Sequence, residues 1–298
     1  MRQLPSAPRV LPQLKKLLCD GNSSMYEVVS LIRIDPGIAA RVLQMGNSAY
    51  YSHGTRCYTV DEAVNRVGYD QVYELVSYAV ASQVLIRPLG VYGLDADDVW
   101  RRSVACALSA EVLAERQQLD RDVAYTIGLL HSVGQVAIDD WAFRFRPELN
   151  FAPGNLPLET CEAERKALGF HNGEAGAALL RHWEFPPVMS EPVRWQYLPR
   201  GTSAHFQLAG LLQVAKWLRT ATCTGTADLP QPDATLLRAL NLTFAQLEKL
   251  VEEVSARMAK VSSLLEAAAP DRAQITFPGG QRVIDSQPVT RNFIDQYV

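Results

Sequence analysis

The chain has 298 residues, of which 48% are hydrophobic and 20% charged, as in an ordinary globular protein with a buried core. Its 29 Lys and Arg residues against 32 Asp and Glu residues give a net charge of −3, which argues against a nucleic-acid-binding protein. No apolar run approaches the roughly 20 residues that span a membrane, and the N-terminus lacks the apolar segment of a secretion signal. We therefore expect a cytoplasmic protein without a membrane segment.

The first third of the chain carries several helix-start signals. A Ser, Thr or Asp before an apolar-periodic run caps a helix, and a following Glu or Pro strengthens the signal. Such pairs are Ser24 with Glu27, Asp35 with Pro36, and Thr59 with Glu62. Gly68 is a typical helix end, and a longer helix is predicted over residues 72–84.

Pro and Gly residues at 87–98 then mark a break, after which the helical periodicity resumes. The pattern predicts a helix opened by Asp95, a single helix over 122–138, a helix capped by Asn172, and helices over 203–222 and 243–268. Only residues 273–284 resemble a short hairpin. We predict an all-α chain: an N-terminal lobe (1–90) and a second lobe (91–268) within one domain, and a tail (269–298).

His131 lies in the apolar stretch "IGLLHSVGQVAI" (127–138). A buried imidazole needs a hydrogen-bond or metal partner, because burial without one is unfavourable. His131 is therefore either a hydrogen-bonded core residue or part of a ligand pocket. The five cysteines are widely spaced without a C-x-x-C pair, so we expect reduced thiols. No P-loop, dinucleotide-binding or nucleophile-elbow motif occurs.

The connection "NSAYYSHGTRCY" (47–58) has an unusual composition. Asn47 and Ser48 are suited to ending a helix by satisfying its last carbonyls. The alternative is a recognition loop, since aromatic side chains on a rigid scaffold often form binding surfaces. The candidate partner-binding residues are Asn47, Ser48, Tyr50, Tyr51 and His53.

The segment "SLIRIDPGIAARVLQMGNSAYY" (30–51) resembles the HDOD domain, a bacterial signalling domain related to the HD phosphohydrolases. The residues that match its motif are Arg33, Asp35, Pro36, Arg41, Asn47, Ser48 and Tyr51. The later stretches "VWRRSVACALSAEVLA", "IGLLHSVGQVAI", "ALGFHNGEAGAALLRHWEFP" and "EPVRWQY" resemble the HD-like half in order and spacing. The resemblance covers residues 1–265 and implies a multi-helical fold whose second lobe is HD-like.

The second lobe lacks most of the metal-binding residues that the resemblance would imply. The family's His-Asp pair falls on His131-Ser132, and its other histidines fall near Arg102, at Asn172 and around Trp195-Gln196. Hydroxyl and amide groups do not neutralise a metal ion, and a working site needs at least three protein ligands. His131 is thus the one surviving position, and we expect no metal and no cofactor.

Arg102 could replace the charge of the lost ion. We expect it to pair with Glu174, or alternatively to bind a phosphate group. The resulting candidate ligand pocket comprises Arg102, His131, Ser132, Asn172 and Trp195.

The resemblance and the degenerate site together predict a non-catalytic regulatory module. It would bind a regulatory protein partner or a phosphate-containing small ligand. The alternative is a residual metal-dependent phosphohydrolase acting on a nucleotide or cyclic dinucleotide.

Overall fold

The computed structural model describes residues 10, 13–14, 17, 23–52, 54–68, 71–72, 88–151, 157–197, 205–226 and 229–267. Throughout these ranges the regular structure is helical, and the only β-type pairing is an isolated bridge between Leu89 and Leu94. The prediction of an all-α chain is confirmed. No described helix has the length and apolar character needed to cross a membrane.

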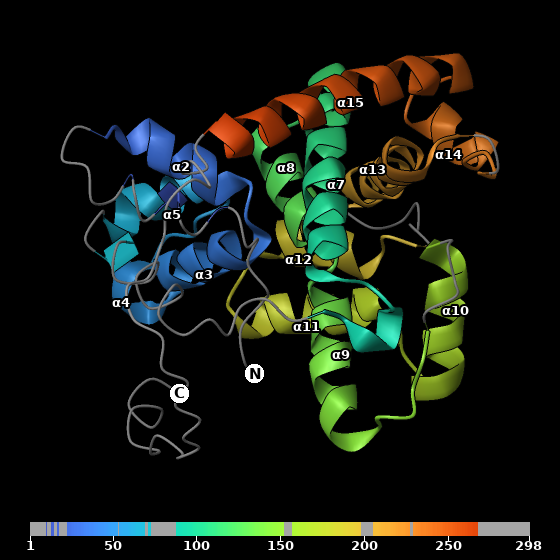
Figure 1. Ribbon diagram of the computed structural model, residues 1–298, viewed down its shortest axis with the longest axis horizontal. Helices are drawn as coiled ribbons and strands as arrows, with labels where there is room; N and C mark the ends of the chain where they lie inside the picture. Colours follow the sequence, from blue (N-terminus) through green and yellow to red (C-terminus); the bar gives the residue numbers. More distant parts are fainter. Residues whose placement is uncertain are drawn as a thin grey trace, which may run out of the picture.

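The N-terminal helices form a group at one side of the molecule (Figure 1). They are α2 (Met25–Arg33), α3 (Pro36–Asn47), α4 (Ala49–Ser52) and α5 (Val60–Val67). The predicted capping box of Ser24 and Glu27 is present, and Thr59 accepts from the backbone of Glu62. Asp35 caps α3 from a fully buried position, accepting from the Ile38 backbone at 2.9 Å. The capping signals in the sequence therefore located these helix starts correctly.

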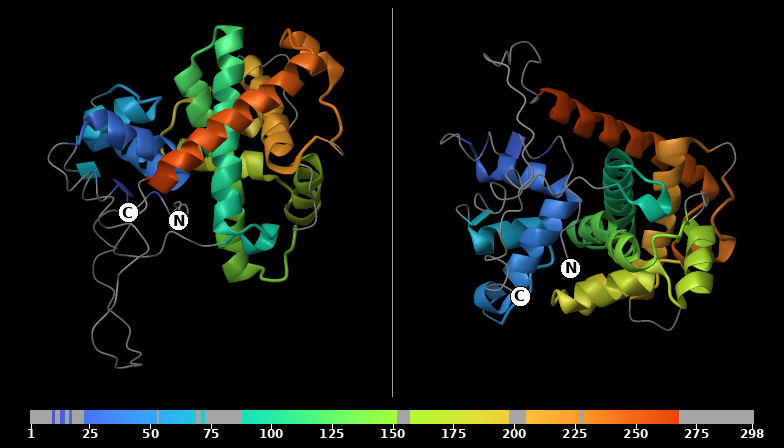
Figure 2. Two further views of the ribbon diagram at one scale, coloured as in Figure 1. Left: turned by 45° about the horizontal axis from the view of Figure 1, so that its top comes forward. Right: turned by 60° about the horizontal axis from the view of Figure 1, so that its bottom comes forward.

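The remaining helices surround α7, the long helix at the centre of Figure 1. In chain order they are η1 (Gly90–Tyr92), α7 (Ala96–Gln117), α8 (Arg121–Leu130), α9 (Val133–Phe145), α10 (Pro157–Leu168), α11 (Asn172–His182), α12 (Pro187–Arg194), α13 (Phe206–Thr224), α14 (Ala234–Ala239) and α15 (Phe244–Ala267). Helices α8 and α13 pack along α7. Helix α15 crosses α7 and points toward the N-terminal helices (Figure 2).

The prediction of one helix over 122–138 is wrong. Helix α8 ends at Leu130, His131 and Ser132 form a turn, and α9 begins at Val133. The imidazole of His131 contacts the Gly128 carbonyl in the last turn of α8, so the side chain itself helps to end the helix. Gly134 then lets α9 approach α11, because a Cβ there would lie 1.8 Å from the Asn172 carbonyl oxygen.

Further differences concern α4, α10, α12 and α14, which were not predicted, and the start of α11. His171, not Asn172, caps α11: its Nδ1 accepts from the Gly173 backbone at 3.1 Å. His53, most of the helix predicted over 72–84, the hairpin predicted at 273–284 and the tail at 269–298 lie outside the described residues. The division into lobes at residue 90 stays a prediction.

Candidate functional site

His131 is buried between α8 and α9, with both ring nitrogens engaged. Its Nδ1 lies 2.7 Å from the Gly128 carbonyl oxygen, and its Nε2 lies 3.0 Å from Nη1 of Arg219 on α13. A carbonyl only accepts, so Nδ1 carries the proton and donates it. Nε2 then holds the ring's only available lone pair, and Arg219 donates to it. The imidazole is a fully satisfied, neutral core residue.

The electrostatic surroundings keep His131 neutral. Burial lowers the pKa of His131 well below its ordinary value, and the nearby charges of Arg219 and Lys216 lower it further. Protonation would also place a second donor opposite the Arg219 guanidinium. The ring therefore serves as an acceptor for Arg219 across the physiological pH range.

Asn172 belongs to a second buried cluster, built around the Glu164 carboxylate of α10. Glu164 accepts from the Asn172 backbone N–H at 2.6 Å and from the Tyr92 hydroxyl at 2.7 Å. The side-chain Nδ2 of Asn172 donates to both carboxylate oxygens of Glu164, at 2.8 and 3.0 Å. The Tyr197 hydroxyl donates to Asn172 Oδ1 at 2.9 Å. Because Asn172 turns inward to these partners, it leaves the capping position of α11 to His171.

Lys216 of α13 lies close to both clusters, because it interacts electrostatically with Arg219 of the first and with Glu164 of the second. Its side chain is buried, and Nζ lies 3.2 Å from the centroid of the Tyr197 ring with no hydrogen-bond partner. Burial lowers the pKa of Lys216 well below its ordinary value, and the charge of Arg219 lowers it further. A buried amine without a hydrogen-bond acceptor is an unusual feature of this core.

The other residues of the predicted pocket lie around this core. Gln196, next to Trp195, donates through Nε2 to the His131 carbonyl at 3.1 Å. Trp195 itself is half-buried and donates to Glu191 at 3.2 Å. The half-buried Ser132 lies 3.3 Å from the Ser103 hydroxyl. The structure thus brings His131 next to residue 196 but joins neither Ser132 nor Trp195 to the imidazole.

The prediction that Arg102 pairs with Glu174 is wrong. Glu174 forms an ion pair with Arg165 at 3.5 Å and accepts a hydrogen bond from the His171 backbone at 3.1 Å, and its partner is not Arg102. Arg102 lies near Arg219: burial lowers the pKa of Arg102, and the Arg219 charge lowers it further. The guanidinium that contacts His131 belongs to Arg219.

Sequence reasoning missed both cations of α13, although a signal was present. Lys216 and Arg219 lie at helical spacing with Leu212 among the buried residues of α13, which are otherwise Ala, Gly, Leu and Val. Charged side chains at such buried positions require a specific partner or role. The sequence of residues 212–219 could therefore have indicated that Lys216 and Arg219 have specific partners or roles in the core.

These residues do not fit the divalent metal that an HD-type site would hold. A metal needs the Nε2 lone pair that Arg219 occupies, and Lys216 and Arg219 add positive charge beside it. The position at Asn172 is held by Glu164 through hydrogen bonds. Among the described residues, no group of three or more His, Cys, Asp or Glu side chains is placed to hold a metal ion.

The connection after α3, called the loop although it contains the short helix α4, has a buried and an exposed part. The fully buried Asn47 side chain bonds both backbone groups of Cys57, at 3.1 Å and 2.7 Å, and Ser48 bonds the Met45 carbonyl at 2.7 Å. Asn47 therefore shapes the loop and cannot itself touch a partner. Tyr50 is 79% exposed, and its ring contacts that of the half-buried Tyr51 edge-on at 4.7 Å.

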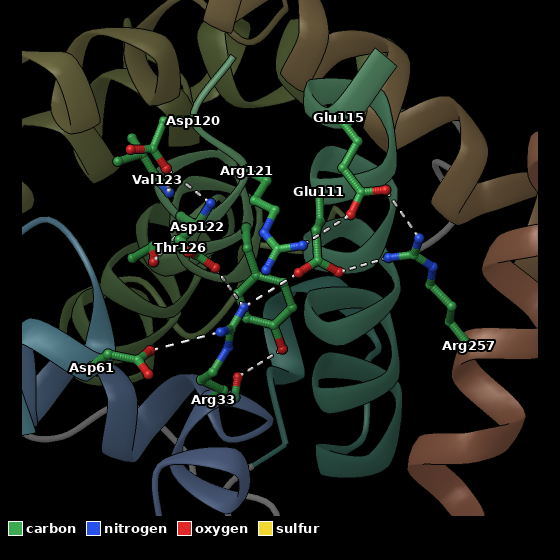
Figure 3. A network of polar contacts seen from close by, with 11 residues as sticks. Arg33, Asp61, Glu111, Glu115, Asp120, Arg121, Asp122, Val123, Thr126 and Arg257 are labelled. Atoms are coloured by element: carbon green, nitrogen blue, oxygen red, sulfur yellow. Dashed lines mark hydrogen bonds and ion pairs between the residues drawn. The ribbon is translucent and has the colours of Figure 1, made fainter. Parts of the chain in front are cut away.

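Arg33, the first residue of the matched motif, joins the N-terminal helices to α7, α8 and, through Glu111, to α15 (Figure 3). Its guanidinium contacts Asp122 at 3.1 Å, Glu111 at 3.3 Å and Asp61 at 3.7 Å. The other oxygen of Glu111 accepts from Arg257 of α15 at 2.9 Å. One carboxylate thus links two arginines from opposite ends of the described chain.

A curated relative and two solved structures are similar to this chain. An uncharacterized protein of Treponema pallidum (strain Nichols) is 26% identical over 203 residues, which cover 65% of this chain and only 37% of that longer protein. The MmoQ response regulator of Methylococcus capsulatus str. Bath superposes with a TM-score of 0.66 at 20% identity, covering 84% of this chain and 98% of that one. A virulence factor of Campylobacter jejuni gives a TM-score of 0.63 at 20% identity, covering 84% and 93%.

These likenesses show a shared fold, and the family assignment comes from the sequence. The HDOD domain profile matches residues 4–199, about two thirds of the chain, which include Arg33, His131 and Asn172. The chain belongs to the HDOD domain family.

Proposed function

We propose that this HDOD domain chain is a non-catalytic regulatory module that acts by binding a protein partner or a small ligand. The observation that carries the proposal is the 3.0 Å contact between Arg219 and His131. An HD-type phosphohydrolase needs a metal ion to generate its attacking water. Here an arginine uses the lone pair that such an ion would need, and it does so inside a packed core.

The exposed part of the loop after α3 supports the binding role. Tyr50 presents a large aromatic surface to solvent, a kind of side chain enriched in protein interfaces. Arg56 connects the same loop to the second lobe, donating to the Asn47 carbonyl at 2.9 Å and to Glu184, just after α11, at 2.8 Å. A partner that binds at Tyr50 would therefore act close to the contact between the loop and α11. One structural neighbour is described as a response regulator, and the proposed role is of that general kind.

Hydrolysis of bis(4-nitrophenyl) phosphate with added Mn²⁺ tests the non-catalytic part. We expect the wild-type chain and a His131→Ala variant to give the same rate as buffer. Metal-dependent hydrolysis by the wild type that His131→Ala removes would overturn the proposal in favour of a phosphohydrolase.

Site-specific photo-crosslinking in the native cells tests the binding part. A photoreactive amino acid would replace Tyr50, and Tyr26 provides a matched control because it is also 79% exposed. We expect a discrete crosslinked product from position 50 that position 26 does not give. Identical products from both positions, or none from position 50, would contradict partner binding at this loop.

A further inference from the structure

A cavity of about 450 Å³ lies beside the buried Lys216 side chain. Its volume is within the range of small-molecule sites. Its walls come from α10, from the residues after α12, from α13 and from the segment leading into α14. Most of the lining is apolar, and the side chains that provide it are Leu158, Trp217, Leu229, Pro230, Pro232 and Leu236. Such walls suit the flat apolar body of a small molecule.

Two lining residues, Lys216 and Gln196, carry polar atoms with no hydrogen-bond partner. The Gln196 amide cannot be reversed, because its Nε2 already donates to the carbonyls of His131 and Val193. Its Oε1 therefore remains an unused acceptor, and Lys216 Nζ remains an unused donor. Both atoms are covered by protein, with Nζ lying against the Tyr197 ring. Because both residues line the cavity, a shift of the two side chains would bring these atoms into contact with a ligand.

The acidic residues of the cavity determine the charge of a suitable ligand. Glu159, Glu162 and Asp233 line the cavity and are exposed to solvent. Three carboxylates at the outer side repel an anionic compound such as a phosphate ester. A neutral ligand avoids that repulsion and still offers hydrogen bonds to the inner residues.

We infer that this cavity binds an uncharged small molecule with an apolar ring and a carboxamide edge. The amide carbonyl would accept from Lys216 Nζ, and the amide N–H would donate to Gln196 Oε1, while the ring packs against Trp217. This inference rests on the proposed role as a binding module and names its ligand class. Gln196 Nε2 also donates to the His131 carbonyl. A ligand bound at Gln196 Oε1 would therefore contact a residue that is hydrogen-bonded to His131, the partner of Arg219.

The test uses two probes of nearly identical shape, indole-3-acetamide and indole-3-acetate, titrated into the full chain and followed by NMR. We expect the amide to bind with a saturable dissociation constant and the acetate to bind more weakly. Lys216→Met, which keeps the chain length without the amine, should weaken amide binding about tenfold, the effect of one lost hydrogen bond. Lys249→Met, at an exposed lysine of α15, serves as the matched control and should leave binding unchanged.

Three outcomes would overturn the inference: tighter binding of the acetate than of the amide, equal amide binding by Lys216→Met and wild type, or no binding of the amide at millimolar concentration. These outcomes concern the cavity alone. The phosphodiesterase assay measures the proposed non-catalytic role separately, so the two proposals can fail independently.

Discussion

Nη1 of Arg219 lies 3.0 Å from Nε2 of His131, so a cation of α13 uses the ring nitrogen that a metal ion would otherwise need. The two residues are 88 positions apart in the chain, and both are buried. The contact makes the histidine that aligns with the HD-type motif a hydrogen-bonded element of the core.

Arg219→Ala should lower the free energy of unfolding by about 1–3 kcal/mol, because His131 Nε2 would remain buried without a donor. Urea unfolding of the wild type and the variant measures the difference. Arg238→Ala, at an exposed arginine of α14, is the control and should change stability by less than about 0.5 kcal/mol. Equal effects of the two substitutions would show that the Arg219–His131 contact contributes nothing specific.

The stability that His131 provides should decline in acid. Its pKa in the folded chain lies well below 6.5, through burial and the facing charges of Arg219, Lys216 and Arg102, with only the Gly128 carbonyl favouring protonation. Below pH 6.5 the unfolded chain therefore binds more protons than the folded chain. The stability is fully present above that pH and falls by up to about 1.4 kcal/mol per pH unit below it.

His131→Gln removes the titrating group and serves as the reference for this effect. The stability of the wild type relative to His131→Gln should therefore decrease as the pH is lowered from 7.5 to 5.5, as measured by urea unfolding at each pH. A constant difference between the two proteins over that range would contradict the lowered pKa.

Lys216→Met should stabilise the chain by about 1–3 kcal/mol, since it replaces a buried amine that has no hydrogen-bond partner with an apolar side chain of similar length. Chemical unfolding measures this, with Lys249→Met again as the control. A destabilised Lys216→Met variant would mean that the amine has a favourable interaction within the core.

Glu111→Gln should destabilise the chain by about 1–3 kcal/mol, because Arg33 and Arg257 both bond to this mostly buried carboxylate. Glu253→Gln provides a control at a more exposed position, which also contacts Arg257, and should cost less than about 1 kcal/mol. Urea unfolding at low and high salt compares them. If both variants lose the same free energy, Glu111 has no special role in joining the N-terminal helices to α15.

Asn47→Ala should cost about 1–3 kcal/mol, because two buried backbone groups of Cys57 would lose their partner. Asn65→Ala, at an exposed position of α5, and Tyr50→Ser should each change stability by less than about 0.5 kcal/mol. Thermal unfolding of the three variants distinguishes Asn47, which stabilises the loop, from Tyr50, which is exposed on it. A large loss for Tyr50→Ser would instead assign Tyr50 to the folded core of the loop.

Local signals in the sequence predicted the helix starts well. The hydrogen bonds that cap a helix form between residues two to four positions apart, so Ser24, Asp35 and Thr59 could be identified without tertiary information. The break at His131 was not predicted. Its hydrogen bond to the Gly128 carbonyl is local, but an imidazole is not a typical helix-ending group, and the approach of α9 to α11 at Gly134 is a tertiary feature.

The candidate site was only partly predictable for the same reason. Motif alignment found His131 and Asn172, but it supplied Arg102 as the compensating charge. The actual contact comes from Arg219, outside the matched residues 4–199. Pairing over 88 positions depends on how α13 packs on α7 and α8, which no local pattern specifies.

The metal content of the chain, purified without chelator and without a histidine tag and measured by elemental mass spectrometry, tests the central claim most directly. We predict well below one equivalent of iron, manganese or zinc per chain, before and after incubation with each ion. One or more equivalents in the wild type, lost in His131→Ala, would contradict the claim that Arg219 holds the position of the metal.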